Sequence, residues 1–445
     1  MEEGILFVLV KMLMMKNKQR RIELKEYRLR RSRKHRLLMK LLSLIEPSCL
    51  KPHLDKSLRF LDETLVGKNK NPKTILIPPA FSFKSNFDDS VDVFVSLIHS
   101  LMCKHGHVII DFSNCQYVSF SALFFLKQIL KQYVEDQNRF IKTISIGKQR
   151  KIKIKISQPK NENELKVLKY LHALDLYHYD EFKDSDGEYL VLPTIEGRFN
   201  GYHNNRKGIA SKNIVNYINA SYSPLKKQLT VCAKNLIESL ISEILNNAED
   251  HCLFKHDWYV SGVTLHDIIK KQDILELNLV IYNYGDSMYD GFEKTKSRNL
   301  ANYTKLDNLY QYHKKQFSSD KYFEKESLFT LYMLGEGISR LKYEDTSRGN
   351  GTMQFLNAFA DLGSIGLIDE KYKSCLSIIS GHTVLTCDND VAPYREGSHL
   401  KISLNKEKDF KKLPDPQYLH YYNRYIPGTF IDCKIYLTDK FIERT

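Results

Sequence analysis

The chain has eight cysteines but no CxxC pair, and their spacing matches no zinc knuckle. We therefore expect neither a disulfide framework nor a structural zinc site, and reduced cysteines are typical of a cytoplasmic protein. An apolar run long enough to cross a bilayer is also missing, because Lys11 interrupts the short apolar stretch near the N-terminus. Since Glu2 and Glu3 stand where a signal peptide carries positive charge, we expect neither a signal peptide nor a transmembrane segment.

Aromatic residues are nearly absent from the basic N-terminus. Residues 1–40 hold thirteen Lys and Arg against four Asp and Glu, which supplies +9 of the formal net charge of +14. Residues 16–40 suit binding to the phosphates of nucleic acid or of anionic lipid. With Tyr27 alone among these charges, base stacking has no support, and a solvated basic tail is an equal alternative. We expect residues 1–60 to form a basic helical segment.

A helical pattern over residues 229–252 carries the most informative polar residues. Its apolar residues recur at helical spacing, and Glu243, Asn247 and Asp250 share one side of the predicted helix. One turn of rise, about 6 Å, separates a carboxylate from an amide oxygen. Such a pair suits the activation of a nucleophile beside Mg²⁺, which prefers oxygen ligands. If this pattern stood alone, the alternative would be that these polar residues form a solvated face of the helix.

Three later segments add to this pattern. Residues 274–285 alternate as a strand does and end in a turn at Asn283 and Gly285. Residues 348–352 (RGNGT) form a glycine-rich loop before a helical pattern, so backbone N–H groups there can approach phosphates closely. Residues 427–429 (PGT) precede an alternating strand.

In that order, the four segments resemble the N, G1, G2 and final boxes of the GHKL ATPase superfamily. This group includes gyrase, the heat-shock chaperone ATPases, histidine kinases and the anti-sigma-factor serine kinases. The resemblance covers residues 226–440. It implies an α/β fold, a two-layer sandwich of the Bergerat type, with ATP and Mg²⁺ as cofactors.

The resemblance assigns a role to each matching residue. Glu243 matches the general base that orients water or an acceptor hydroxyl for attack on the γ-phosphate, and Asn247 matches the Mg²⁺ ligand. Asp250 matches a second polar residue of the nucleotide pocket, and Thr429 matches the threonine that hydrogen-bonds at the adenine. The implied phosphate-binding residues are Arg348, Gly349, Gly351 and Thr352.

Two positions of the G1 box depart from the family. Its first residue is normally an aspartate that accepts a hydrogen bond from the adenine amino group. Here it is Asn283, whose amide oxygen accepts without the help of a charge. Gly285 keeps the first glycine, but Ser287 replaces the second and narrows the backbone angles open to the turn. We expect weakened nucleotide affinity or base choice, and less efficient turnover.

Residues 288–347 lie between the G1 box and the phosphate loop, as the ATP lid of the family does. This segment is rich in Lys, Tyr and Asn and contains one apolar helical patch at residues 328–334. Arg340, Lys342 and Arg348 are cations that can meet phosphates when the lid closes. A solvated surface is the alternative for the first two.

A second α/β pattern precedes the ATPase-like region. Residues 108–112 (VIIDF) predict a buried strand that leads through a serine-containing loop into a helical run. Over residues 72–182 this resembles a STAS domain, the fold of anti-sigma-factor antagonists, and an unrelated small α/β domain is the alternative. The serine phosphorylated in that family aligns with Phe120, so the domain is also compatible with a docking or dimerising module. Glycine, asparagine and proline over residues 183–225 predict an irregular linker.

Together these patterns predict an ATP-binding regulatory protein that joins a STAS-like module to a histidine kinase-like ATPase domain. Mg²⁺-dependent hydrolysis, or phosphoryl transfer to a hydroxyl of a protein partner as in the anti-sigma kinases, would switch what the neighbouring module binds. Two alternatives stay open: a nucleotide-sensing scaffold with little turnover, and a regulator tethered to nucleic acid by the basic N-terminus. A homodimer stays open as well.

Overall fold

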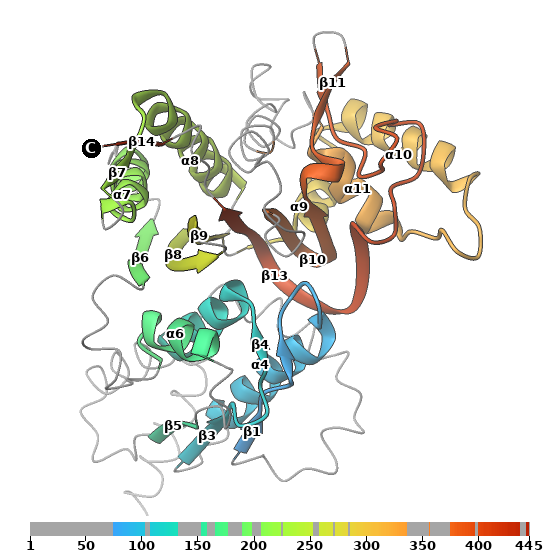
Figure 1. The fold of residues 1–445 in the computed structure, drawn as a ribbon. Coiled ribbons are helices and arrows are strands. Elements are labelled where there is room, and N and C mark those ends of the chain that lie inside the picture. The colour runs from blue at the N-terminus through green and yellow to red at the C-terminus, as the bar shows by residue number, and fades with distance from the viewer. Residues whose placement is uncertain are drawn as a thin grey trace, which may run out of the picture. The chain divides into compact units, whose positions relative to one another are not determined.

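Figure 1 shows the computed structural model of the chain, in which all described residues belong to one unit, Pro52–Thr445. The predicted basic segment 1–60, with residues 16–40, lies outside the described residues. No helix in the described part is both long and apolar enough to cross a membrane. The described ranges are 74–102, 107–131, 153–157, 165–176, 189–197, 206–223, 226–251, 258–269, 272–283, 285–335, 356, 374–396, 399–436 and 442–444.

Residues 74–176 form an α/β arrangement, called the N-terminal layer below. Its sheet has three parallel strands in the order β1-β3-β5, and a short parallel pair joins β2 to β4. The predicted buried strand is the central one, where Val108 and Ile110 are fully buried. Ser119 precedes a helix over residues 120–131, and its Oγ accepts a hydrogen bond from the Ala122 N–H at 3.2 Å. The other elements are β1 (Thr74–Leu76), β2 (Ala80–Phe81), α4 (Phe87–Met102), β3 (His107–Asp111), β4 (Tyr117–Val118), β5 (Lys153–Ser157) and α6 (Leu165–Ala173).

A five-stranded antiparallel sheet, called the central sheet, follows in the chain. Its strand order is β10-β13-β9-β8-β6. Residues 427–429, expected to precede a strand, lie inside β13, where the register against β10 shifts on either side of Gly381. The long strand continues through the turn-like sequence because the shift in register accommodates the extra residues of β13. The strands are β6 (Tyr189–Gly197), β8 (Trp258–Ile269), β9 (Gln272–Asn283), β10 (Cys375–Cys387) and β13 (Leu419–Tyr436).

The structure corrects the predicted irregular linker at residues 183–225. This segment contains β6 and α7 (Arg206–Ala220), and both contribute buried residues to the core. One of its glycines serves packing, because a Cβ on Gly197 would lie 1.9 Å from the Trp258 ring. Glycine and asparagine indicated a loop, whereas the tertiary contacts favour a strand and a helix.

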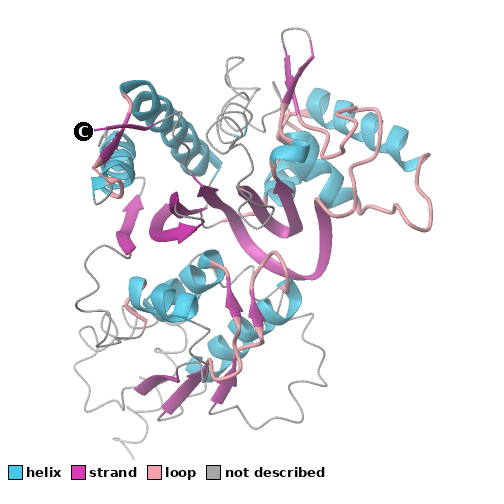
Figure 2. Ribbon diagram, viewed as in Figure 1, coloured by secondary structure: helices cyan, strands magenta, loops and turns pink. Residues whose placement is uncertain are grey.

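The helices α7 and α8 (Val231–His251) cover one face of the central sheet, called the helix face. The predicted helix over residues 229–252 is confirmed as α8, which buries its apolar side against alternate residues of β9. Figure 2 shows α7 and α8 as neighbouring helices. The core residues contributed by β9 and α8 are Leu275, Leu277, Leu279, Ile281, Ile237, Ile241, Ile244, Leu245 and Ala248.

The predicted lid region is largely helical. α11 confirms the apolar helical patch at residues 328–334, since Leu328 and Phe329 are fully buried. Residues 336–347 lie outside the described part of the chain. The helices of the predicted lid region are α9 (Met288–Lys294), α10 (Leu300–Lys314) and α11 (Lys325–Met333). The remaining elements are β7 (Lys227–Leu229), η5 (Asn389–Val391), β11 (Tyr394–Glu396), β12 (His399–Lys401) and β14 (Ile442–Arg444).

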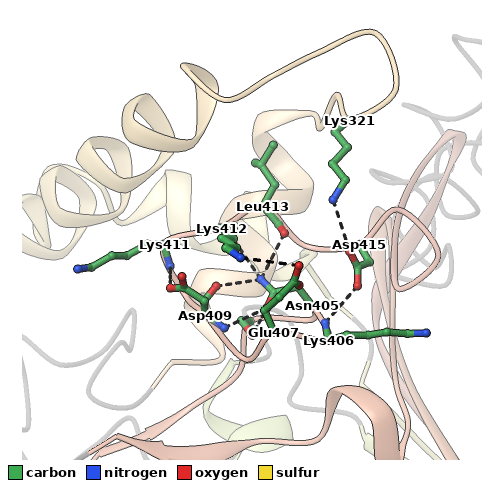
Figure 3. A network of polar contacts seen from close by, with 10 residues as sticks. Lys321, Asn405, Lys406, Glu407, Asp409, Lys411, Lys412, Leu413 and Asp415 are labelled. Carbon is green, nitrogen blue, oxygen red and sulfur yellow. Dashed lines mark hydrogen bonds and ion pairs between the residues drawn. The ribbon is translucent and has the colours of Figure 1, made fainter.

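A buried amide holds the loop between β12 and β13, as Figure 3 shows. Asn405 is 1% exposed, and its Oδ1 accepts from the Asp409 N–H at 3.0 Å. Its Nδ2 donates to the backbone oxygens of Asp409 at 2.9 Å and Leu413 at 3.3 Å. An ion pair of 3.5 Å between Lys321 and Asp415 ties this loop to the segment between α10 and α11. This ion pair thus connects the loop with the segment between α10 and α11.

Candidate functional site

Glu243, the predicted general base, lies half-buried on α8. Its neighbours Ile241 and Ile244 are buried in the core and fix the rotation of the helix. Asn247 and Asp250 lie on the same helix, but their side chains fall outside the described residues. Within the described ranges, no group of three or more His, Cys, Asp or Glu side chains is arranged to hold a metal ion. The Mg²⁺ site at Asn247 therefore stays a prediction.

Asn283 and Thr429, which are 146 residues apart in the chain, meet in the central sheet. Asn283 ends β9 directly opposite Thr429 of β13, and its Oδ1 accepts a hydrogen bond from the Thr429 N–H at 3.1 Å. The Thr429 Oγ1 lies 2.9 Å from Ser380 Oγ on β10. Because side chains alternate along a strand, Asn283 shares the helix face with Leu279 and Ile281. The two residues to which the resemblance gives the first G1 position and the threonine of the final box thus lie side by side.

A glycine makes this approach possible. Gly428 has a φ of +78°, and a Cβ there would lie 2.0 Å from the backbone oxygen of Asn283. Any side chain would both strain the backbone and separate the two strands. Gly428 is therefore required by the close approach of β13 to β9.

The turn after β9 positions the start of α9. Gly285 has a φ of +148°, which favours glycine. Ser287 caps α9, because its Oγ accepts from the Asp290 N–H at 3.0 Å. Asp286 is buried and pairs with Lys294 at 2.5 Å. Ser287, a departure from the family's glycine, therefore has a structural task at the first turn of α9.

Sequence reasoning missed a half-buried carboxyl beside this turn. Glu326 of α11 accepts a hydrogen bond from the His382 N–H at 2.8 Å, and a Cβ on Gly381 would lie 2.5 Å from its Oε1. Burial raises the pKa of Glu326 to about 7, and the charges of Asp290 and Glu324 act in the same direction. No local pattern marks this glutamate, because its burial comes from β10, which follows it by some fifty residues in the chain.

The predicted phosphate loop cannot be placed. Arg348, Gly349, Gly351 and Thr352 lie outside the described residues, as does most of the helical pattern that follows them. Leu356 alone is described there, and it is fully buried in the core on the helix face.

The opposite side of the central sheet, called the docking face, contacts the N-terminal layer through aromatic rings. Tyr282 of β9 and Phe430 of β13 stack at 3.8 Å between ring centroids. Phe125, on the helix over residues 120–131, meets both rings edge-on, at 5.6 Å and 5.4 Å. Phe83 also contacts Phe430, at 5.3 Å. These residues form an apolar contact between the layer and the sheet.

Polar groups are buried at the same contact. The Ser121 hydroxyl donates to Asp432 of β13, and the Tyr170 and Tyr436 hydroxyls donate to Glu276 of β9 at 3.1 Å and 2.9 Å. Burial raises the pKa of Asp432 to about 6, although the Ser121 hydrogen bond opposes the shift. The layer is thereby joined to the sheet by hydrogen bonds whose geometry is specific.

The serine-containing loop has tasks that the STAS resemblance did not imply. Ser119 caps the following helix, and Ser121 bonds to Asp432. Phe120, which aligns with the phosphorylated serine of that family, lies edge-on to Tyr170 at 5.7 Å. The loop thus serves as a contact surface within this chain.

Comparison of the sequence with protein-family models and with curated proteins, and of the fold with solved structures, gave no match.

Proposed function

We propose that the chain is an ATP-binding regulatory protein that depends on Mg²⁺, with a histidine kinase-like ATPase domain of the two-layer sandwich type. The observation that supports this most is the meeting of Asn283 and Thr429 on the face of the sheet that carries α8 and Glu243. Four ordered sequence boxes suggested this proximity, and a chance resemblance would not require it. ATP is the nucleotide that the resemblance implies.

The proposed role of each site residue follows from the chemistry of its side chain. Asn283, Thr429 and Ser380 offer neutral hydrogen-bonding groups, which suit a base rather than a phosphate. Glu243 is the carboxylate that would orient the attacking hydroxyl, while Asn247 would hold Mg²⁺ between the phosphates. The phosphates themselves would meet residues 348–352.

Contacts across the docking face connect the proposed nucleotide site with the N-terminal layer. β9 carries Asn283 toward the helix face and Tyr282 toward Phe125 of the layer. A change in the position of β9 on nucleotide binding would therefore be felt at the layer contact. We propose that hydrolysis, or phosphoryl transfer to a hydroxyl of a protein partner, sets whether the layer is available for binding.

The test is a pair of substitutions on α8. Glu243→Ala should retain nucleotide binding and reduce phosphate release or transfer by at least about a hundredfold, because a positioned base contributes about that factor. Glu238→Ala, on the same helix, is the matched control and should leave turnover unchanged. Binding is measured by calorimetry, and transfer with γ-labelled ATP and GTP. Equal turnover in wild type and Glu243→Ala would show that Glu243 is not the base.

One observation favours a second function, a nucleotide-sensing scaffold with little turnover. The G1 residue is an amide held by the Thr429 N–H, so the charge-assisted contact of the family is missing. Under this alternative, the wild type binds nucleotide with Mg²⁺ and releases no phosphate. Asn247→Ala should lower Mg²⁺-dependent affinity under either function.

A further inference from the structure

A carboxyl group joins the helices of the predicted lid region to the central sheet. Glu326 of α11 accepts a hydrogen bond from the backbone N–H of His382 on β10 at 2.8 Å. The Ser327 and Thr383 hydroxyls, 3.3 Å apart, form a second polar contact between the same helix and strand. The attachment of α11 to β10 therefore depends in part on the state of the Glu326 carboxyl.

The Glu326 carboxyl is packed tightly where the register of β10 shifts. Gly381 has a φ of +64°, and a Cβ there would lie 2.5 Å from the Glu326 Oε1 and 3.0 Å from the Cβ of Ser287, which caps α9. Because the β10 backbone and the start of α9 approach so closely, little space is left for water on this side of the carboxyl. An ionised oxygen in this position is poorly solvated.

The charges around this contact do not compensate an ionised Glu326. Asp290 of α9 and Glu324, beside α11, are acidic and disfavour its charge. Burial lowers the pKa of His382, so its imidazole is neutral at pH 7. The cations of the surrounding elements pair with other carboxylates: Lys294 with Asp286, Lys325 with Asp307, and Arg424 with Asp92. The other titratable groups nearby are phenols with raised pKa values, on Tyr289, Tyr421 and Tyr425.

From this arrangement we infer that Glu326 forms a proton-dependent contact, which holds α11 on the central sheet when the carboxyl is protonated and loosens when it ionises. A protonated carboxyl still accepts from the His382 N–H through its carbonyl oxygen. Burial raises the pKa of Glu326 from 4.5 to about 7, which places the change near neutral pH. The stabilisation is therefore fully present below pH about 4.5 and is lost as the pH rises through about 7.

The contact lies beside the candidate site. Ser380 precedes Gly381, and its Oγ lies 2.9 Å from the Thr429 Oγ1 and accepts from the Met288 N–H at 2.8 Å. Loosening at Gly381 would therefore reach Ser380 and the start of α9. The inference does not depend on the proposed nucleotide chemistry, and its test needs no nucleotide.

Hydrogen exchange of the full chain, read by mass spectrometry, tests the inference in peptides from α11 and from β10 around His382. After correction for the pH dependence of intrinsic exchange, the opening equilibrium of these peptides should increase about tenfold from pH 6 to pH 8. A carboxyl whose pKa falls from about 7 to 4.5 on opening requires that factor. Peptides from α8 are the reference and should change less. Equal protection of α11 at the two pH values would overturn the inference.

Three variants assign the titrating group. Glu326→Gln keeps an acceptor for the His382 N–H but cannot ionise, so the increase should fall to about twofold or less. Glu324→Gln is the matched control, because it removes the same charge beside the same helix, and it should keep most of the increase. His382→Gln removes the imidazole and keeps the backbone N–H, so it should also keep the increase.

Two outcomes with these variants would contradict the assignment to Glu326. One is an increase that persists in Glu326→Gln, and the other is an increase that disappears in His382→Gln. Thermal unfolding shows whether each variant folds. If Glu326→Gln does not fold, the wild type and the two other variants still decide, because each has its own expected result.

Discussion

The two faces of the central sheet are built from the same strands by different chemistry. Toward α8, β9 presents Leu277 and Leu279, which join a continuous apolar core. Toward the N-terminal layer the same strand presents Glu276 and Tyr282, which bond to a tyrosine and stack on a phenylalanine of its neighbours. Apolar burial on the helix face does not depend on exact partners, because the hydrophobic effect has no direction. Buried hydrogen bonds on the docking face do require exact partners.

This difference indicates what each face does. A continuous apolar face stabilises the fold in proportion to the area buried. A face with buried carboxyl groups gains specificity at some cost in stability, since Asp432 and Glu276 must leave water. The helix face is therefore the structural core, and the docking face is suited to a contact that recognises one arrangement of the layer.

The largest expected effects on stability come from truncating one buried side chain on each face. Leu279→Ala should lower the free energy of unfolding by about 2–5 kcal/mol, and Phe430→Ala by about 3–5 kcal/mol, because both side chains are buried. Urea unfolding measures both. A loss below about 1 kcal/mol for Phe430→Ala would show that the layer does not pack on the docking face in solution.

A smaller effect, and one specific to the docking face, depends on pH. Burial raises the pKa of Asp432 from 3.8 to about 6, so the folded chain holds this proton more tightly than the unfolded chain. The contribution of Asp432 to stability is then fully present below pH about 4 and falls as pH rises to about 6, by about 2 kcal/mol. Asp432→Asn should remove this fall and leave the variant more stable than wild type at pH 7. Parallel stability curves for the two proteins from pH 4 to 7 would contradict this.

The hydroxyl that bonds to Asp432 should matter less. Ser121→Ala removes the donor of one buried hydrogen bond, and we expect a loss of about 1 kcal/mol at neutral pH. In the Asp432→Asn background the same substitution should cost less, since the bond to a charged acceptor is gone. Additive losses in this double-mutant cycle would mean that the two side chains do not interact.

The smallest effect is expected at the rim of the contact. Lys131 of the layer pairs with Glu196 of β6, and their side chains are 40% and 30% exposed. Glu196→Gln should therefore change stability by about 0.5 kcal/mol or less, and added salt should reduce even that. A loss as large as that of Ser121→Ala would place the centre of the contact nearer β6 than β13.

Periodicity was sufficient for elements whose burial follows from their own residues. The helix α8, the strand β9 and the patch in α11 were all predicted, because apolar spacing marks the side that faces a core. Residues 183–225 were predicted wrongly, since glycine was taken as flexibility. Gly197 instead leaves room for the ring of Trp258, which lies on a strand that comes later in the chain.

The candidate site divides in the same way. The family resemblance implied that Asn283 and Thr429 belong to one site, and the pairing of β9 with β13 places them opposite each other. The hydrogen bond of Glu326 with the His382 N–H and the capping role of Ser287 could not be predicted, because each depends on a backbone group whose position the fold decides.

The sequence by itself determined elements such as α8 and β9, and it suggested which polar residues could carry nucleotide chemistry, since apolar spacing and residue type are local. Only the tertiary structure decided that the Asn283 oxygen faces a backbone N–H, and that Ser121 meets a carboxyl of a strand 311 residues away. Such contacts form between residues distant in the chain, where hydrogen-bond direction and burial arise from packing. For this reason the direction of the hydrogen bond at the Asn283 amide is a property of the fold.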